Sequence, residues 1–401
     1  VDEAAPDVPA AEVLKLGISA DDGALQFRPA RPASNTARPP VLAEHAAFIR
    51  FTSGSTGNPK GVVLNHAQQL WTARTLSGIF DLGENHRELL LVSMALSGGW
   101  QRVAATLLGG GCVVMAEGPL SVQGVLEQVV AQSATGFFTP PPLLRMLLAS
   151  RPEGVQSALA GCRSIEIGSA AVSGAELQQL MALLPAARVF LHYGLTECSR
   201  AVILDTRQYP HKLDTAGRPA PGVIISIRDE DNQELGPDQA GQIFVRGPQL
   251  AEAYWKQPEL SSERFSGGWL ATGDYGSVDA DGFVRLLGRR DDMINCGGRS
   301  FFPAEVEQAL GTPDGVEQLL VAGVPDPRGV LQEVPWAFVV PTDAAGWTPE
   351  ALLASARRCL PSHMVPRWVV TVPALPLTAS GKPDRLRVVE LYGPAKQDDK
   401  P

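Results

Sequence analysis

Cysteine and positive charge are both scarce in this sequence of 401 residues. The five cysteines lie far apart, include no C-x-x-C pair and are odd in number, which argues against a disulfide framework or a zinc site. This cysteine usage is typical of a reducing compartment, so we expect a cytoplasmic location. Lysine and arginine together number 34 against 43 acidic residues, and the net charge of −9 argues against a nucleic acid partner.

Long apolar runs are also missing from the sequence. None approaches the roughly 20 residues that a membrane-spanning helix requires, so we expect no membrane span. The first residues, Val1–Pro6, lack the basic and apolar regions of a signal peptide. Because the sequence starts at Val1 and not at a methionine, we expect a processed or trimmed start. The length suffices for two or three packed units.

The pattern of the residues changes twice along the chain. Between residues 46 and 205, short apolar segments alternate with helix-like segments, which predicts a mostly parallel sheet covered by helices. From about 205 to 290 the strand-like segments are short and the turns are frequent, which predicts an antiparallel or barrel-like piece. After residue 290, helical and strand-like segments together predict a small α+β unit.

These patterns predict the α/β fold class and two domains. We expect a large N-terminal α/β domain with a barrel-like β subdomain, followed by a small α+β C-terminal domain. The N-terminal domain would span residues 1–290, with its barrel-like part at about 205–290, and the C-terminal domain would span residues 291–401. The polar run at 288–292 would connect them, with the hinge of a mobile C-terminal domain near Asp291.

A turn rich in hydroxyl groups and glycine separates two apolar segments near the start of the α/β part. Hydroxyl and backbone N–H groups suit phosphate oxygens, glycine permits close approach of the backbone, and lysine adds a charge. A solvated turn is the alternative, but the concentration of hydroxyl residues, glycines and a lysine in one turn favours a phosphate site. The spacing differs from G-x-x-x-x-G-K-[ST], which argues against a P-loop NTPase. The residues are Thr52, Ser53, Gly54, Ser55, Thr56, Gly57 and Lys60.

This turn resembles the phosphate loop of the adenylate-forming superfamily, whose pattern is roughly [ST]-S-G-[ST]-[ST]-G-x-P-K-G. The superfamily contains acyl- and aryl-CoA synthetases, adenylation domains of peptide synthetases, and luciferases. Other segments between Ala46 and Arg385 resemble further family motifs, in the family order. They are Y-G-x-T-E at 193–197, T-G-D-x-G at 272–276, G-R at 288–289, a G-G segment at 297–298 and P-x-T-x-x-G-K-x-x-R at 376–385.

The segment at 193–197 ends the last predicted parallel strand, where ligands of open α/β sheets gather. A hydroxyl and a carboxylate there could hold a phosphate and its Mg²⁺, which prefers oxygen ligands. A polar turn is the alternative. The resemblance implies that Thr196 contacts the α-phosphate, that Glu197 binds Mg²⁺, and that Tyr193 lies against the adenine, next to Gly194.

Two further stretches complete the implied nucleotide site. Asp274 stands in what we expect to be a glycine turn, and the resemblance implies that it holds both ribose hydroxyls, with Arg289 also reaching the ribose. A small-residue turn after the preceding strand would line the adenine and acyl pockets. Either stretch alone also fits an ordinary turn. The residues of the small turn are Gly168, Ser169 and Ala170.

The C-terminal motifs imply roles in the two halves of the reaction. Lys382 would serve adenylation, and Gly297 with Gly298 would let a thioester arm pass close to the backbone. A solvated lysine and a hairpin turn are the alternatives. The segment from Gly241 to Trp255 resembles a structural family motif. The sequence departs from the family pattern at Leu96, Gln242, Ala253, Asn295 and Phe301, and the stretch before the phosphate loop is short.

The resemblance implies activation of a carboxylic acid by ATP and Mg²⁺, with release of pyrophosphate. The acyl group would pass to the thiol of CoA or of a carrier-protein phosphopantetheine. No Asp lies between Ser93 and Ser97 to pair an ammonium group, which favours an aryl or acyl acid over an α-amino acid. The alternative is a non-catalytic or adenylation-only acyl-adenylate-binding protein of the same fold. Because Glu197, Asp274 and Lys382 are all present, we favour the enzyme.

Overall fold

The structure is a computed structural model of the chain. It describes residues 42–52, 60–118, 121–170, 172–311, 313–342, 347–378 and 383–394, together with the strands β1 (Leu16–Ile18) and β2 (Leu25–Phe27). The chain divides into two units, Val1–Leu42 and Ala43–Pro401. In the first unit, β1 pairs with β2 in antiparallel register. The second unit holds all the elements that follow.

A seven-stranded sheet, in the order β11-β10-β9-β8-β7-β5-β6, forms the centre of the N-terminal part. The five strands from β6 to β9 pair in parallel, and β10 and β11 extend the sheet in antiparallel register. This confirms the predicted alternation of strands and helices around a mostly parallel sheet. The strands are β5 (Arg87–Leu90), β6 (Cys112–Met115), β7 (Gly136–Thr139), β8 (Ser164–Ile167), β9 (Arg188–Tyr193), β10 (Val202–Asp205) and β11 (Arg218–Pro219).

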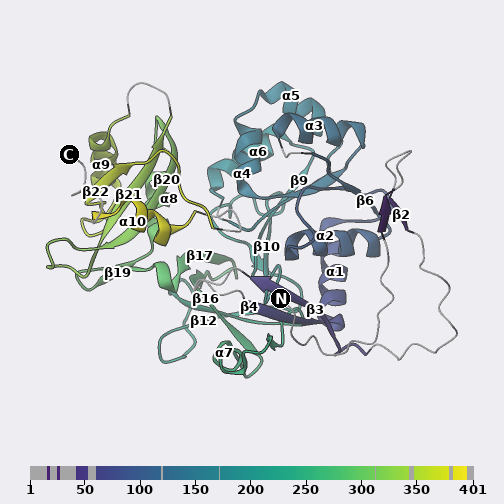
Figure 1. Ribbon diagram of the computed structural model, residues 1–401, viewed down its shortest axis with the longest axis horizontal. Helices are drawn as coiled ribbons and strands as arrows, with labels where there is room; N and C mark the ends of the chain where they lie inside the picture. Colours follow the sequence, from purple (N-terminus) through teal and green to yellow (C-terminus); the bar gives the residue numbers. More distant parts are fainter. Residues whose placement is uncertain are drawn as a thin grey trace. The chain divides into compact units, whose positions relative to one another are not determined.

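Helices cover both faces of this sheet (Figure 1). Successive side chains of a strand point to opposite faces. Val189 and Leu191 of β9 pack in one core cluster with α3–α6, whereas Phe190 packs in another with α1 and α2. The helices are α1 (His66–Phe80), α2 (Ser97–Leu108), α3 (Val122–Ala131), α4 (Pro141–Leu148), α5 (Pro152–Leu159) and α6 (Gly174–Leu183).

A hairpin flanks the predicted phosphate loop. Strands β3 (Ala46–Thr52) and β4 (Lys60–Asn65) pair in antiparallel register, with Thr52 opposite Lys60. The two apolar segments on either side of the loop are therefore strands, as predicted, and residues 53–59 lie outside the described residues. A distant segment, β14 (Ala253–Tyr254), pairs with β4 and completes a three-stranded sheet.

The middle of the chain forms an antiparallel five-stranded sheet, as the short strands and frequent turns predicted. Its apolar side packs with residues after β9, among them Cys198 and Val202, so this subdomain shares a core with the end of the large sheet. The elements are β12 (Ile224–Arg228), β13 (Gly241–Arg246), α7 (Pro258–Arg264), β15 (Phe265–Ser266), β16 (Trp269–Val278) and β17 (Val284–Arg289).

The C-terminal elements build a small α+β domain around its own core, which includes Val306, Trp336 and Phe338. A 3-10 turn, η1 (Arg290–Asp292), precedes it at the expected hinge. The small α+β unit that the sequence predicted after residue 290 is therefore confirmed. The elements are β18 (Ile294–Cys296), β19 (Arg299–Phe301), α8 (Pro303–Leu310), β20 (Val316–Pro325), β21 (Glu333–Pro341), α9 (Pro349–Cys359), β22 (Trp368–Thr371) and α10 (Arg385–Tyr392).

Candidate functional site

The carboxyl ends of β8 and β9 lie side by side, because the two strands pair in parallel register. The turn that starts at Gly168 follows β8, and Tyr193 ends β9. Gly168 lies against the ring of His192: a Cβ atom at position 168 would stand 2.0 Å from the imidazole Cε1. Ser169 has a φ of 73°, a left-handed conformation that is uncommon for residues other than glycine. This turn is therefore closely packed and conformationally constrained.

Tyr193 connects β9 with the antiparallel subdomain. Its hydroxyl donates a hydrogen bond of 2.6 Å to Oδ2 of Asp274, and Oδ1 of Asp274 lies 3.3 Å from Nε of Arg289. Asp274 and Arg289 are opposite each other in the β16–β17 pair. Three residues from three separate motifs thus meet around one buried carboxylate. The expectation of a glycine turn at Asp274 is wrong: the residue lies inside strand β16, next to a register shift after Tyr275.

The protonation of Tyr193 follows from its surroundings. Burial, reinforced by the Asp274 carboxylate, raises the pKa of the Tyr193 hydroxyl well above its usual value. The phenol is therefore neutral at neutral pH and can donate the hydrogen bond. A carboxylate oxygen has more than one acceptor site, so Asp274 can accept additional hydroxyl donors beside Tyr193 and Arg289. A ribose offers such donors.

Glu197 lies in a tight turn after β9, next to Thr196. The backbone N–H groups and carbonyl groups of Leu195 and Cys198 bond to each other across this turn. The Glu197 side chain accepts a hydrogen bond of 2.7 Å, at Oε1, from the hydroxyl of Tyr254. The Nζ atom of Lys60 lies 6.0 Å from the centre of the Tyr254 ring, within cation–π range. Lys60 and Glu197, predicted from different motifs, are therefore linked through one tyrosine.

The described residues fit a magnesium ion that obtains most of its ligands from phosphate. Among them, no group of three or more His, Cys, Asp or Glu side chains could enclose a metal ion. Mg²⁺ is commonly held by one or two carboxylates, water and substrate phosphates. Tyr254 donates to Oε1 of Glu197, and among the described residues no other side chain bonds to this carboxylate, so Oε2 would be available to a metal. Glu197 is the side chain that would hold Mg²⁺ here.

A buried network of charges lies next to His192, and the sequence analysis missed it. The guanidinium of Arg102 donates to Glu88, and that of Arg200 donates to Glu166. The Nη1 atom of Arg102 also lies 3.5 Å from Glu166, which connects the two pairs. The Nδ1 atom of His192 lies 2.7 Å from Glu166. The signal in the sequence was a glutamate inside each of the apolar strands β5 and β8, the kind of position where a charge is rarely buried alone.

Two arginines and two glutamates of opposite charge balance each other in this network, and their contacts determine the pKa values of the glutamates. Burial favours neutral carboxyl groups, but Arg102 outweighs it at Glu88, and Arg200 with His192 outweighs it at Glu166, so the pKa values of both glutamates are lowered. Burial lowers the pKa of His192. The imidazole is therefore neutral at neutral pH, and a proton on Nδ1, the nitrogen that faces Glu166, would leave Nε2 as an acceptor.

Other predicted site residues lie apart from these contacts or outside the description. Gly297 and Gly298 form the two-residue turn between β18 and β19, with φ values of 61° and 79°. Two glycines with positive φ are typical of such hairpins. The Asn295 side chain accepts a hydrogen bond of 3.0 Å from the Gly298 backbone, so this departure from the family pattern has a structural role. Residues 53–57 and Lys382 lie outside the described residues.

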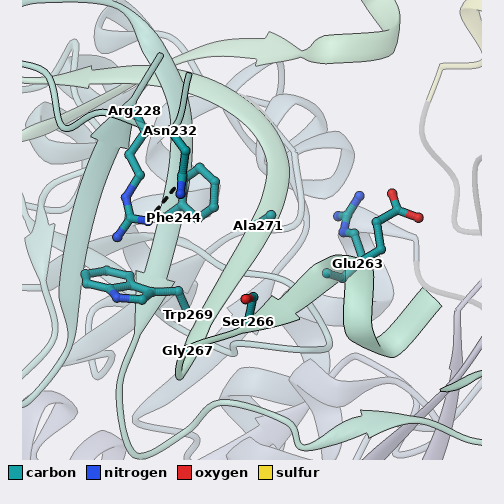
Figure 2. A pocket seen from close by; sticks show the side chains of 9 residues that line it. Arg228, Asn232, Phe244, Glu263, Ser266, Gly267, Trp269 and Ala271 are labelled. Atoms are coloured by element: carbon teal, nitrogen blue, oxygen red, sulfur yellow. Dashed lines mark hydrogen bonds between the residues drawn. The ribbon is translucent and has the colours of Figure 1, made fainter. Parts of the chain in front are cut away.

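A pocket of about 230 Å³ lies on the antiparallel subdomain (Figure 2). The guanidinium of Arg228 lies 4.6 Å from the ring centres of both Phe244 and Trp269, and it donates to Asn232. Arg264, at another wall, donates to the Thr272 carbonyl. None of the predicted site residues that the structure describes lines this pocket. Its cations already have partners, and we assign it no ligand.

Comparison with known families identifies the family to which this chain belongs. The profile of the AMP-binding enzymes matches residues 2–255, and the profile of their C-terminal domain matches residues 305–382. The chain belongs to the family of AMP-binding enzymes. The predicted resemblance to the adenylate-forming superfamily is thereby confirmed. The predicted domain boundary at residue 290 lies between the two matched ranges and stays a prediction.

Three similar proteins illustrate the family. The feruloyl-CoA synthase of an Amycolatopsis species is 33% identical over 346 residues, which cover 86% of this chain and 69% of that protein. The amide bond synthetase McbA from Marinactinospora thermotolerans has a TM-score of 0.78 at 29% identity, with 86% of this chain and 69% of that chain covered. The o-succinylbenzoate CoA synthetase of Bacillus subtilis, in complex with ATP and magnesium ion, has a TM-score of 0.77 at 28% identity, with 89% and 73% covered.

These matches confirm the predicted fold class, a large N-terminal α/β domain followed by a small C-terminal domain. The prediction of an AMP-forming acid–thiol ligase agrees with the CoA synthases among the relatives. Across the described residues, none of the helices has both the length and the apolar character needed to cross a membrane.

Proposed function

We propose that this chain uses ATP to activate a carboxylic acid as an acyl-adenylate, with release of pyrophosphate, and then transfers the acyl group to a thiol. The observation that carries this proposal is the meeting of Tyr193, Asp274 and Arg289 around one carboxylate. Each comes from a different motif, and together they form an acceptor group suited to the hydroxyls of a ribose. Tyr193 would lie beside the adenine.

The remaining motif residues would hold the phosphates. Thr196 and Lys60 would contact phosphate oxygens together with the hydroxyl residues at 52–57. Mg²⁺, when bound on Glu197, would neutralise part of the phosphate charge. Catalysis of phosphoryl transfer consists mainly of positioning and electrostatic stabilisation, and Lys382 would supply charge at the α-phosphate. The acid carboxylate would attack the α-phosphorus, and pyrophosphate would leave.

The second half of the reaction would use the other face of the small domain. Rotation near Asp291 would replace Lys382 by the Gly297–Gly298 hairpin, in the way that hinge motions complete many active sites. The hairpin is a tight turn that permits close passage of an extended thiol arm. We propose CoA as the acceptor. A carrier-protein phosphopantetheine would present the same thiol chemistry.

The acid would be an aryl or acyl acid. Its pocket would lie beside Gly168 and Ala170, where Gly168 meets the neutral ring of His192, and Trp100 and Leu96 would supply apolar surface. No carboxylate is present at 93–97 to pair the ammonium group of an amino acid. We also propose a reducing, cytoplasmic location, because all five cysteines are free.

Acid-dependent pyrophosphate release tests this function directly. The panel should contain hydroxycinnamic, benzoic, arylacetic and fatty acids, each with ATP, Mg²⁺ and CoA. We expect pyrophosphate release with at least one of these acids and, by mass spectrometry, an acyl-CoA product. Release of orthophosphate without any acid would instead indicate an NTPase. Product formed with an amine but not with CoA would overturn the thiol assignment.

Glu197→Ala is the matched inactive variant. The Glu197 side chain is only partly buried, so we expect the variant to fold. It should lose most of the pyrophosphate release. Unchanged release at saturating Mg²⁺ would remove Glu197 from the site. Binding of acyl-adenylate by wild type without any turnover would favour the alternative of a non-catalytic acyl-adenylate-binding protein.

A further inference from the structure

A short segment after β13 connects the phosphate-loop hairpin with the turn that carries Glu197. In this segment, residues 250–255, the N–H of Trp255 donates to the Gly61 carbonyl at 2.6 Å, and Tyr254 pairs with Val62 of β4. The N–H of Ala251 donates to the Glu197 carbonyl at 2.8 Å. The segment therefore bonds on one side to the strand that follows the phosphate loop and on the other side to the backbone of Glu197.

Tyr254 is the side chain that completes this connection. Only 4% of its surface is exposed, and its ring packs 5.4 Å from the ring of Phe265. Its backbone N–H donates to the hydroxyl of Ser261 at 2.9 Å. A ring held in this way has little freedom, so its hydroxyl reaches Oε1 of Glu197 from a fixed direction. The same ring presents its face to Lys60.

We propose that Tyr254 is a positioning residue that orients the Glu197 carboxylate toward the metal–nucleotide, a role that rests on the proposed function. The hydroxyl donates to one oxygen of Glu197 and thereby fixes the carboxylate plane. The second oxygen then points in a defined direction. Without this bond the carboxylate rotates about its terminal torsion, which has a broad energy well. Groups that bond to metal ligands typically change metal affinity or activity about 10- to 100-fold when they are removed.

The test is Tyr254→Phe, which removes the hydroxyl and keeps the ring. Binding of ATP should be measured by calorimetry without any acid, over a series of Mg²⁺ concentrations and also with a chelator. We expect the Mg²⁺ concentration needed for half-maximal nucleotide binding to rise about 10- to 100-fold, while metal-free ATP binding changes less than about twofold. The Mg²⁺ dependence of pyrophosphate release should shift in the same direction.

Two further variants make the result specific. In the double variant with Glu197→Ala, the hydroxyl should no longer matter, because both residues act through one contact. Tyr209→Phe is the matched control. The Tyr209 ring packs on Phe283, and the structure gives no hydrogen bond from its hydroxyl to any described residue. Removing that hydroxyl should leave the Mg²⁺ dependence unchanged.

The proposal is overturned if Tyr254→Phe leaves the Mg²⁺ requirement unchanged. It is equally overturned if the variant weakens the binding of metal-free and of metal-bound nucleotide by the same factor. It is also overturned if the double variant binds the nucleotide with Mg²⁺ more weakly than Glu197→Ala does, by the full effect that Tyr254→Phe has alone. Thermal unfolding reports a purely structural effect separately. Acid-dependent pyrophosphate release by wild type judges the proposed function independently, because the binding measurement needs no acid and no turnover.

Discussion

The hydroxyl of Tyr193 and the carboxylate of Asp274 share a hydrogen bond of 2.6 Å, although the two residues are 81 positions apart in the sequence. The bond joins the last parallel strand of the α/β sheet to the antiparallel subdomain. It also orients the Asp274 carboxylate beside the strand end where the adenine is proposed to lie. The proposed nucleotide site thus depends on the relative position of the seven-stranded sheet and the antiparallel subdomain.

Replacing Asp274 by alanine should weaken ATP binding by about 10- to 100-fold. Hydrogen bonds to a charged group contribute about 1.5–3 kcal/mol, and the variant removes the carboxylate that we propose as the acceptor for the ribose hydroxyls. Tyr193→Phe, which leaves the carboxylate in place, should cause a smaller loss. Calorimetric titration with ATP in the presence of Mg²⁺ measures both. Equal affinities for wild type and Asp274→Ala would remove Asp274 from the nucleotide site.

Replacing Lys382 by alanine should slow adenylate formation by about a hundred- to a thousandfold, the typical cost of losing one donor that stabilises transition-state charge. Thiol attack on a supplied acyl-adenylate should remain nearly normal, because we assign that step to the Gly297–Gly298 face. Quenched-flow measurements time the two half-reactions separately. Adenylate formed at the normal rate would contradict the lysine assignment, and equal loss of both steps would contradict the two positions of the small domain.

Replacing Arg102 by methionine should destabilise the fold by about 3–5 kcal/mol, because it leaves the buried carboxylates of Glu88 and Glu166 with one guanidinium between them. The matched control is Arg188→Met. Arg188 is 41% exposed, and its partner Asp205 keeps hydrogen bonds from the backbone N–H groups of Arg207 and Gln208, so the loss of Arg188 should cost only about 1 kcal/mol. Denaturant unfolding measures both changes. Equal losses would show that the buried network contributes no more than a surface pair.

The same network predicts how stability depends on pH. The pKa values of Glu88 and Glu166 are lower in the folded protein than the ordinary value of 4.5, so the stability they contribute is complete above about pH 4.5 and is lost as the pH falls below it. In the Arg102→Met variant less of this stabilisation exists. The difference in unfolding free energy between wild type and variant should therefore narrow on acidification. A constant difference down to pH 3 would contradict this origin.

The native protein should react at two of its five cysteines. Cys112 and Cys359 are exposed, whereas the other three are buried. Burial, together with Glu88, raises the pKa of Cys162 to about 12, so its thiolate is almost absent at pH 8. Alkylation followed by intact-mass measurement should show two additions in the native state and five in denaturant. Rapid native modification of Cys162 would contradict its burial.

The strands and helices of this chain were predictable where the apolar pattern is local. The strand that ends at Tyr193, and the mixture of helices and strands after residue 290, follow from their own residues. Asp274 was misjudged, because its glycines suggested a turn, whereas pairing with β13 and β17 holds it in a strand. Tertiary pairing overrode the local preference.

The side-chain contacts were less predictable than the strands. Tyr254 belongs to the segment from Gly241 to Trp255, which resembles a structural motif of the family. No neighbouring residue in that segment predicts a contact with Glu197. The network around Glu166 joins residues of strands β5, β8 and β9 to Arg102 of helix α2 and to Arg200, which follows β9. No single stretch of the sequence therefore reveals it. Motifs predicted which residues bear the chemistry, but the bonds that orient those residues depend on long-range packing.

The contact between Gly168 and His192 makes the two positions interdependent over evolutionary time. A methyl group at 168 would overlap an imidazole whose Nδ1 lies beside Glu166, so the ring cannot simply move aside. A lineage that enlarges residue 168 must first replace His192 by a smaller residue, and the reverse order passes through a damaged intermediate. Changes in the acid pocket that we propose beside this turn are therefore expected to occur as ordered pairs, which restricts the routes by which its specificity can diverge.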